Sequence, residues 1–450
     1  MRKSVKNMTQ GSPVSLIFFF SLPLMIGNIF QQLYTTIDSI IVGRFVGVSA
    51  LAAIGASDWI YWMILWSIHG LTQGFGILIA QDFGSDNKKR LREIICSVIS
   101  LAVLFSILLT VIPLAMISPV LTLLHTPPAI FSETQLYLRI LFGGNAVVIA
   151  FNTSSSILRS LGNSKLPLLA MVIAALTNIA LDLLFVVKFQ FGIAGAAAAT
   201  LLAQFLAFLI CLFPLLHLPL IHPTYADWRA CSRHFTRLCR FSIPLAVQNS
   251  IIALGGMFVQ NVLNGLGVSF VAAVTAANKI NGILESIATA LGYGLGTFIA
   301  QNYGAGKTAR IHAGLRASVA LSALFAVCIS VFCIIIGKNI IGLFLSNSEN
   351  NFQTILALSY QYLKILCTGL FILFLVHLYR NALQSLGNTI GPVLSGITEL
   401  VTRMIGAIAF PFLWGQTGIF YCEVFAWIGT AVVLMFAYYF VVHQRKHIMS

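Results

Sequence analysis

Charged residues are scarce in this sequence. Asp, Glu, Lys and Arg make up only 8% of the 450 residues, whereas hydrophobic residues make up 58%. So little charge excludes a water-soluble globular domain and is typical of a protein that crosses a membrane many times. Acidic residues are the scarcest, with 12 Asp and Glu against 26 Lys and Arg, so an acid inside an apolar segment needs an explanation.

Several motifs of catalysis and cofactor binding are also missing. The eight cysteines form no CxxC pair, and the nine histidines form no HExxH or similar ligand spacing. The sequence has no GxxxxGK[ST] loop for a nucleotide phosphate. We therefore expect no enzyme activity, no cofactor, no metal site of the zinc type and no drive from ATP.

Long apolar runs dominate what is present. Twelve of them are long enough to cross a hydrocarbon layer of about 30 Å as helices. They lie at residues 15–40, 50–80, 94–117, 136–158, 166–187, 193–216, 241–264, 268–300, 314–336, 354–384, 389–413 and 418–442. The sequence predicts an all-α integral membrane protein with twelve transmembrane helices.

The basic residues follow this topology. Most of the 26, Arg380 among them, fall on one side of the membrane if the N-terminus is cytoplasmic. This asymmetry is the positive-inside pattern, so we expect both termini in the cytoplasm. The net charge of +14 then orients the protein in the bilayer and does not indicate a nucleic-acid partner.

The second half of the chain repeats the first at an offset of about 220 to 225 residues. FSLPLMIGN at 20–28 recurs as FSIPLAVQN at 241–249, and GFGILIAQDFG at 74–84 recurs as GLGTFIAQNYG at 294–304. The repeat predicts two pseudo-symmetric lobes of six helices, at 1–216 and 241–450, around a cytoplasmic basic linker at 217–240. Such paired lobes favour a transporter that works by alternating access, although a duplicated scaffold can also be inert.

The linker carries four arginines in a regular spacing. Arg229, Arg233, Arg237 and Arg240 are four, four and three residues apart. This pattern fits a basic amphipathic helix on the inner leaflet, and it fits an ordinary positively charged linker equally well.

The first apolar run carries a stripe of polar residues. Asn28, Gln31, Gln32, Thr35 and Asp38 recur every three or four positions, so on a helix they share one face. An ionised Asp facing lipid is costly, so this stripe faces a bundle interior or a wet cavity. Pro23 weakens the same helix, which makes it a candidate moving part. The alternative is a kinked structural helix whose stripe only packs against its neighbours.

Oxygen-bearing side chains recur in the other spans of the N-terminal half. Asn178 and Asp182 are four residues apart and lie on one helical face, while Asn152 and Thr200 add further oxygens. Carboxylate, amide and hydroxyl oxygens suit a hard cation such as Na⁺. They also suit a shared proton, because a carboxylate removed from water holds its proton more readily. The sequence leaves H⁺ and Na⁺ open.

The C-terminal half differs at the matching positions. Val259 corresponds to Asp38, and the region that matches Asn178 and Asp182 contains Arg403. Glu399 and Arg403 are four apart, which favours a self-neutralised pair over a substrate contact. Glu285 and Glu423 are candidates for contact with a cationic substrate or for structural roles.

These motifs resemble those of the multidrug and toxic compound extrusion (MATE) family, especially its DinF-like branch. The resemblance rests on PLMIGNIFQQLYTTIDSIIVGRFVG, on GILIAQDFG with its copy TFIAQNYG, and on two LxSLGN motifs, and it runs through nearly the whole chain. It implies a V-shaped pair of lobes that exports amphipathic, often cationic compounds in exchange for H⁺ or Na⁺. The cation-coupling residues of that branch match Asp38, Asn152, Asn178, Asp182 and Thr200, and its helix-bending proline matches Pro23.

The sequence therefore predicts a cation-coupled antiporter in the inner membrane of a bacterium. Its partners are a small organic substrate and the bilayer, it is expected to be a monomer, and Na⁺ at Asp38, Asn178 and Asp182 is the one metal ion considered. The polar stripe of the first span, with Glu285 and Glu423, supplies candidate substrate contacts. The alternative is a flippase of the same superfold for lipid-linked saccharide precursors, which the acidic interior disfavours.

Overall fold

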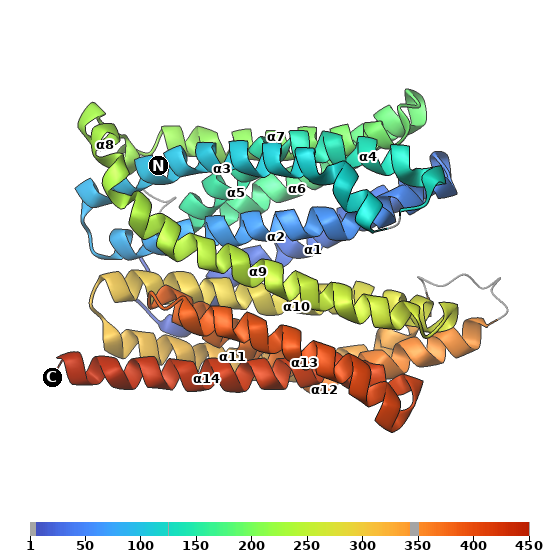
Figure 1. Ribbon diagram of the computed structural model, residues 1–450. Coiled ribbons are helices and arrows are strands. Elements are labelled where there is room, and N and C mark those ends of the chain that lie inside the picture. The colour runs from blue at the N-terminus through green and yellow to red at the C-terminus, as the bar shows by residue number, and fades with distance from the viewer. Residues whose placement is uncertain (1–5, 125, 343–350, 450) are drawn as a thin grey trace. The chain divides into compact units, whose positions relative to one another are not determined.

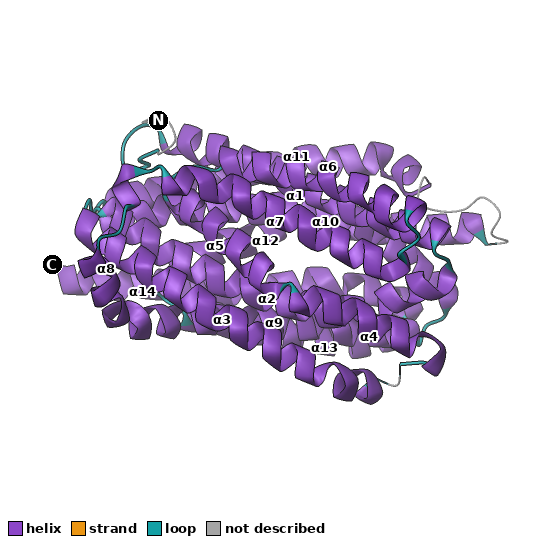
Figure 2. Ribbon diagram, turned by 90° about the horizontal axis from the view of Figure 1, so that it is seen from above, coloured by secondary structure: helices purple, strands orange, loops and turns teal. Residues whose placement is uncertain are grey.

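The computed structural model describes residues 6–124, 126–342 and 351–449. Every regular element within these ranges is a helix, and Figure 2 shows the helices joined by short loops with no strand in the described chain. The principal helices are α1 (Pro13–Phe45), α2 (Val48–Gly84), α3 (Lys88–Leu123), α4 (Pro128–Gly143), α5 (Asn145–Ser160), α6 (Lys165–Asp182), α7 (Gly192–Leu216), α8 (Tyr225–Ala230), α9 (Phe235–Asn264), α10 (Val268–Gly304), α11 (Thr308–Gly342), α12 (Phe352–Ser385), α13 (Ile390–Trp414) and α14 (Cys422–Met449). Short turns complete the chain at η2 (Leu183–Lys188), η3 (Pro219–Ile221), η4 (Cys231–His234) and η5 (Gln416–Tyr421).

The predicted all-α membrane architecture is confirmed. Eleven of the described helical segments are long and apolar enough to cross a membrane, and the bent pair α4 and α5 brings the total to twelve. The run predicted as one span at 136–158 is therefore two helices, which meet at 44° around Gly144. Gly144 packs against Leu201 of α7, where there is no room for a β-carbon, so the chain turns at this contact.

Several helices expose large apolar side chains in continuous bands. On α3 the exposed residues include Val103, Ile107 and Val111, and on α11 they include Leu324 and Val327. Their spacing of three or four residues places each set on one helical face. A soluble monomer rarely exposes such a surface, so these faces are suited to contact with lipid tails.

By its contacts, the chain divides into two compact units. The N-terminal unit consists mainly of Ile26–Ala246, and the C-terminal unit consists of Thr9–Met25, Val247–Tyr303 and Lys307–Ser450. Helix α1 is thus divided: its first part belongs to the C-terminal unit and the part that carries Asp38 belongs to the N-terminal unit. The sequence repeat does not predict this division, because similarity in sequence does not report which helices touch. Figure 1 shows that the helices of each unit run side by side.

Close helix contacts through small residues recur in both units. In the N-terminal unit the Ser160 hydroxyl of α5 donates to the Gly76 carbonyl of α2 at 2.7 Å. In the C-terminal unit the Ser385 hydroxyl of α12 donates to the Gly296 carbonyl of α10 at 2.8 Å. Glycine lets the two backbones approach, and the serine satisfies a polar group in the apolar interior. The repeat in sequence is therefore also a repeat in packing.

The linker is not one continuous amphipathic helix. Between α7 and α9 the chain forms η3, the six-residue α8 and η4, and α9 begins only at Phe235. A capping box fixes the start of α8, because the Thr224 hydroxyl accepts from the Asp227 amide and the Asp227 carboxylate accepts from the Thr224 amide. The two halves of the predicted arginine stripe thus lie on different elements.

Candidate functional site

Two buried carboxyl groups of the N-terminal unit face each other. Asp38 on α1 is 8% exposed, and Asp182 at the end of α6 is 0% exposed. Their carboxyl groups are within hydrogen-bonding range of each other. Two ionised carboxylates at this range repel each other, and a hydrogen bond between them requires a proton on one of them. The pair therefore favours a shared proton or a bound cation.

The oxygens around this pair lack donors. Asp38 Oδ1, Asp182 Oδ1, Asp182 Oδ2 and Asn178 Oδ1 are all buried, and none accepts a hydrogen bond from the described residues. Buried polar atoms are normally hydrogen-bonded, so such a group of unpaired acceptors needs an explanation. Acceptor oxygens without donors are what a cation, or a proton shared between carboxylates, would satisfy.

The other predicted residues of the cation site make different hydrogen bonds. Asn178 Nδ2 donates to Thr200 Oγ1 across the α6–α7 contact at 3.4 Å, which leaves the Asn178 carbonyl oxygen for the site. Asn152 on α5 instead donates to the Val148 carbonyl of its own helix at 2.9 Å. The described contacts thus bring Asp38 to Asp182 and Asn178 to Thr200, and they record no contact of Asn152 with these four.

The helix that carries Asp182 changes its geometry directly after it. Helix α6 passes into η2, a π-helical turn, in which the Phe189 amide donates to the Leu184 carbonyl at 2.9 Å. Single π turns within α-helices are frequent at functional sites, because they alter the backbone hydrogen-bond pattern locally. Asp182 is thus the last residue of regular α-helix before a distortion.

Aromatic residues that the sequence analysis missed surround the pair. The hydroxyl groups of Tyr34 and Tyr137 lie within electrostatic range of both carboxyl groups. Tyr61 and Gln204 are close neighbours of each other, yet the Tyr61 hydroxyl and the Gln204 side-chain carbonyl are both buried without a well-formed hydrogen bond. Tyr34 could have been found from sequence, because it precedes Asp38 by one helical turn. The other residues come from distant helices.

The polar stripe on α1 forms as its spacing predicts. Asn28, Gln31, Gln32 and Thr35 are half-buried, whereas Leu33 on another face is exposed. The Thr35 hydroxyl donates within its own helix, to the Gln32 carbonyl at 3.0 Å. Pro23 is buried, and α1 is one unbroken helix from Pro13 to Phe45.

The C-terminal unit contains a buried ion-pair network in place of paired acids. Arg403 Nη2 lies 3.1 Å from Glu399 Oε1 and 2.9 Å from Glu423 Oε2. Glu399 Oε2 also accepts from Arg380 Nη2 at 2.7 Å. The expected pair of Glu399 with Arg403 is present, and it is part of a longer chain. Arg380, counted from sequence among the loop charges, is instead a buried member of this network.

The two units use matching positions in different ways. In the repeat Arg403 lies in the region that matches Asn178 and Asp182, and Glu423 lies in the region that matches Thr200. Asn178 and Thr200 are hydrogen-bonded in one unit, and Arg403 and Glu423 are ion-paired in the other. The guanidinium group of Arg403 thus supplies a permanent cation at a place where the N-terminal unit has only neutral groups and acids.

Glu285 on α10 lies beside this network without joining it. It is half-buried, and its charged neighbours are Arg403, Glu423, Glu399 and Arg380. Among the described residues no ion pair of Glu285 is recorded, and both arginines already contact other carboxylates. Three glutamates and two arginines lie here, and Glu285 is the glutamate for which the described residues record no ion pair.

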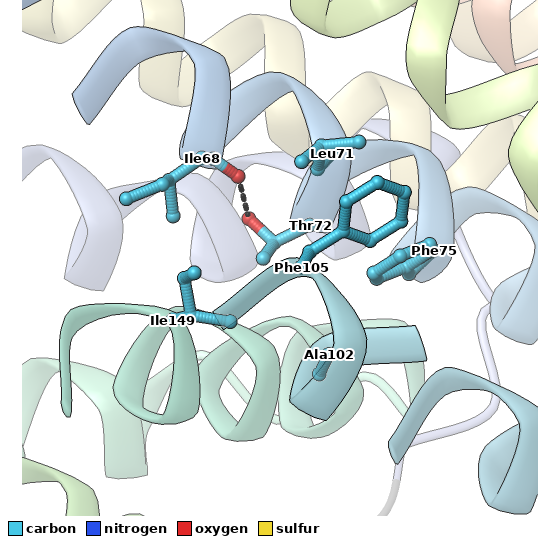
Figure 3. A pocket seen from close by; sticks show the side chains of 7 residues that line it. All are labelled: Ile68, Leu71, Thr72, Phe75, Ala102, Phe105 and Ile149. Atoms are coloured by element: carbon cyan, nitrogen blue, oxygen red, sulfur yellow. Dashed lines mark hydrogen bonds between the residues drawn. The ribbon is translucent and has the colours of Figure 1, made fainter. Parts of the chain in front are cut away.

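A small gap among side chains of the N-terminal unit is too narrow to hold a water molecule. Figure 3 shows that its lining is apolar apart from Thr72, whose hydroxyl donates to the Ile68 carbonyl. The lining residues come from α2, α3 and α5 and are Ile68, Leu71, Thr72, Phe75, Ala102, Phe105 and Ile149. Because its one polar side chain is already bonded, this gap offers nothing to a cation.

A duplicated bundle of membrane-length helices, with unsatisfied buried acids in one half, defines a multi-pass membrane transporter. The MatE family model matches residues 23–184 and 244–408, one segment in each half of the repeat. The chain belongs to the MATE family, and the proteins of this family are transporters and not enzymes.

Individual relatives agree with this assignment. The chain is 30% identical over 359 residues to a probable multidrug resistance protein, YpnP, of Bacillus subtilis, and the match covers 79% of each chain. It is 24% identical to the probable multidrug resistance protein NorM of Thermotoga maritima, over 92% of this chain and 88% of that one. A MOP superfamily transporter from Pyrococcus furiosus has the same fold, with a TM-score of 0.90, 22% identity and 98% of each chain covered.

Proposed function

We propose that this protein is a cation-coupled antiporter that exports amphipathic, cationic organic compounds by alternating access. The observation that carries the proposal is the group of buried, donor-free oxygens on Asp38, Asn178 and Asp182. A group of this kind is stable only when a cation or proton occupies it, so its occupancy can be linked to the conformation of the helices around it. The names of the relatives, which are probable multidrug resistance proteins, support drugs or toxic metabolites as cargo.

In this mechanism Asp38 and Asp182 are the coupling pair. A monovalent cation that enters from outside offsets one of the two negative charges and relieves the repulsion, and its release to the cytoplasm restores the repulsion between the two carboxylates. Asn178 and Thr200 provide further oxygens if the ion is Na⁺, whereas a proton needs only the two carboxyl groups. Asn152 belongs to this set only if its amide turns away from the Val148 carbonyl.

Helix α1 is the element that would transmit the change. Asp38 lies on it, and Pro23 removes one backbone hydrogen bond about four turns earlier, which lowers the cost of bending. Neutralisation of Asp38 would then change the balance between a straight and a bent form of α1. This role for Pro23 rests on its position in α1 and on the family resemblance.

Each unit, taken by itself, carries polar or acidic groups that are candidate substrate contacts. Asn28, Gln31, Gln32 and Thr35 offer hydrogen bonds from α1, and Glu285 of α10 offers a carboxyl group with no recorded ion pair among the described residues. Glu423 is already paired with Arg403 at 2.9 Å, so its contact with a substrate would need that pair to open. We propose a monomer in the inner membrane of a bacterium, with both termini in the cytoplasm.

Efflux of ethidium from vesicles tests the proposal. Wild type and Asp38→Asn are compared under an imposed pH gradient and, separately, under an imposed Na⁺ gradient. We expect one gradient to drive efflux by the wild type, which identifies the ion, and the variant to lose at least about 90% of that rate because its neutral amide cannot take up a positive charge in exchange.

Equal amounts of inserted, folded protein are the control for this comparison. Unchanged efflux by Asp38→Asn would contradict the coupling role of Asp38. If neither gradient drives efflux by folded wild type, the proposal of multidrug export is wrong. Transport of a lipid-linked saccharide precursor is then the next hypothesis to test.

A further inference from the structure

The segment that joins the two halves is held firmly against the start of α3. Arg92 Nε donates to Asp227 Oδ2 at 3.0 Å, and the Ser97 hydroxyl donates to the Cys231 carbonyl at 2.7 Å. Asp227 is buried and also caps α8 through Thr224. Figure 1 shows α8 at the same end of the N-terminal unit as the first turn of α3. The linker is therefore a fixed surface of this unit.

The buried acids at this end are all engaged by bases. Asp82 pairs with Arg90 at 3.3 Å and with Arg237 at 3.5 Å. Glu93 contacts His234 at 3.2 Å. Together with the Arg92–Asp227 pair, these contacts engage the buried carboxylates that the structure describes at this end.

Three arginines of the linker remain exposed. For Arg229, Arg233 and Arg240, the described part of the chain records no ion pair and no side-chain hydrogen bond. Two large aromatic residues of α8, the helix that carries Arg229, are also exposed, Tyr225 at 85% and Trp228 at 40%. We call these five residues the linker surface. No carboxylate in the described part of the chain pairs with its three arginines.

We propose that the linker surface binds the headgroups of anionic phospholipids, a role that goes beyond the proposed transport function. Three features favour this partner. Arginine matches the geometry of a phosphate with two parallel hydrogen bonds, and basic residues close to an anionic leaflet are attracted to it. Tyr and Trp are enriched at the level of the headgroups, where the ring is apolar and its edge can donate a hydrogen bond. The neighbouring spans hold the surface at the edge of the bilayer.

The test measures lipid association directly and does not use transport. The full chain is reconstituted in vesicles that contain spin-labelled phosphatidylglycerol or spin-labelled phosphatidylcholine, and the motionally restricted fraction of each lipid gives its relative association constant. The test variant is R229Q/R233Q/R240Q. The matched control is R44Q/K188Q/K338Q, which removes three exposed positive charges outside the linker surface.

We expect the wild type to prefer phosphatidylglycerol, and the test variant to lose this preference by about five-fold or more. The control variant should keep it, and association of phosphatidylcholine should not change in either protein. The preference should also weaken at high salt, because exposed charges are screened. An unchanged preference in the test variant would overturn the proposal, as would an equal loss in the control, which would show only an effect of net charge.

A Trp228→Ala variant checks the aromatic part of the surface without changing the charge. We expect a smaller loss of phosphatidylglycerol association than in the triple variant. Ethidium efflux by each folded variant is recorded separately, so that loss of lipid binding and failure of the transport proposal give different results. If Trp228→Ala binds phosphatidylglycerol as the wild type does, the aromatic contribution is refuted.

Discussion

At the scale of single residues, the two units differ in how the charges of their buried acids are balanced. Asp38 and Asp182 are buried together, and among the described residues no base is recorded in contact with either carboxyl group, so a cation that balances them has to come from outside the protein. In the C-terminal unit Arg403 lies between Glu399 and Glu423, and Arg380 also pairs with Glu399, so two tethered cations balance these two acids. A tethered cation cannot be released, so we expect coupling to reside in the N-terminal unit and Arg403 to serve stability.

Substitution of Arg403 by Met tests this assignment. The variant keeps much of the side-chain volume but leaves Glu423 without its arginine, and an unpaired buried charge costs about 3–5 kcal/mol. We expect a clear fall in the thermal unfolding midpoint in detergent. Lys338→Met is the matched control, since Lys338 is exposed on α11 and the change should alter stability by no more than about 0.5 kcal/mol. Equal midpoints for both variants would show that the network is not structural.

The sequence revealed some of these residues and not others for a physical reason. Asp38 stands out because an acid in an apolar run is costly, and Asn178 and Asp182 share a helical face. Tyr61, Tyr137 and Gln204 do not stand out, since each belongs to a different helix and only tertiary packing brings them near the site. Arg380 was predicted to lie among the exposed basic residues on the cytoplasmic side, but it is buried. It lies close to the end of an apolar run, where the sequence does not distinguish a buried charged residue from an exposed one.

At the scale of elements, two adjacent glycines with different surroundings lie at the bend between α4 and α5. A β-carbon on Gly144 would overlap the Leu201 side chain, whereas a β-carbon on Gly143 would meet nothing within 4 Å. We expect Gly144→Ala to destabilise the protein by about 1–3 kcal/mol through overpacking, and Gly143→Ala to have little effect. Thermal unfolding of both variants measures the difference. If the two behave alike, packing on Leu201 does not set the bend.

The helices were predictable, but their ends and partners were less so. Hydropathy predicts a transmembrane helix because a helix must have a minimum apolar length to cross the hydrocarbon layer. All twelve predicted runs fall on described helices. Hydropathy does not report a break inside an apolar run, which is why Gly144 was missed. Nor does it show that the start of α1 packs with the C-terminal unit, since that depends on contacts.

At the scale of the whole molecule, the proposed antiporter needs only one coupling site. If one positive charge enters per cycle, a membrane potential of about 100 mV supplies about 2.3 kcal/mol. At about 1.36 kcal/mol per decade, this can sustain a solute gradient of roughly fifty-fold. The asymmetry between the units agrees with this account. Among the described residues, the facing pair of acids without a basic partner, Asp38 and Asp182, lies in the N-terminal unit, whereas Arg403 pairs with Glu423 in the C-terminal unit.

Ion movement driven by substrate tests the central claim most directly. Proteoliposomes are loaded with ethidium and diluted into substrate-free buffer, and entry of ²²Na⁺ or of protons is followed as ethidium leaves. The account predicts ion uptake that rises in proportion to ethidium release for the wild type, and none above background for folded Asp182→Asn. Ethidium release without ion uptake, or equal uptake by Asp182→Asn, would contradict coupling through the Asp38–Asp182 pair.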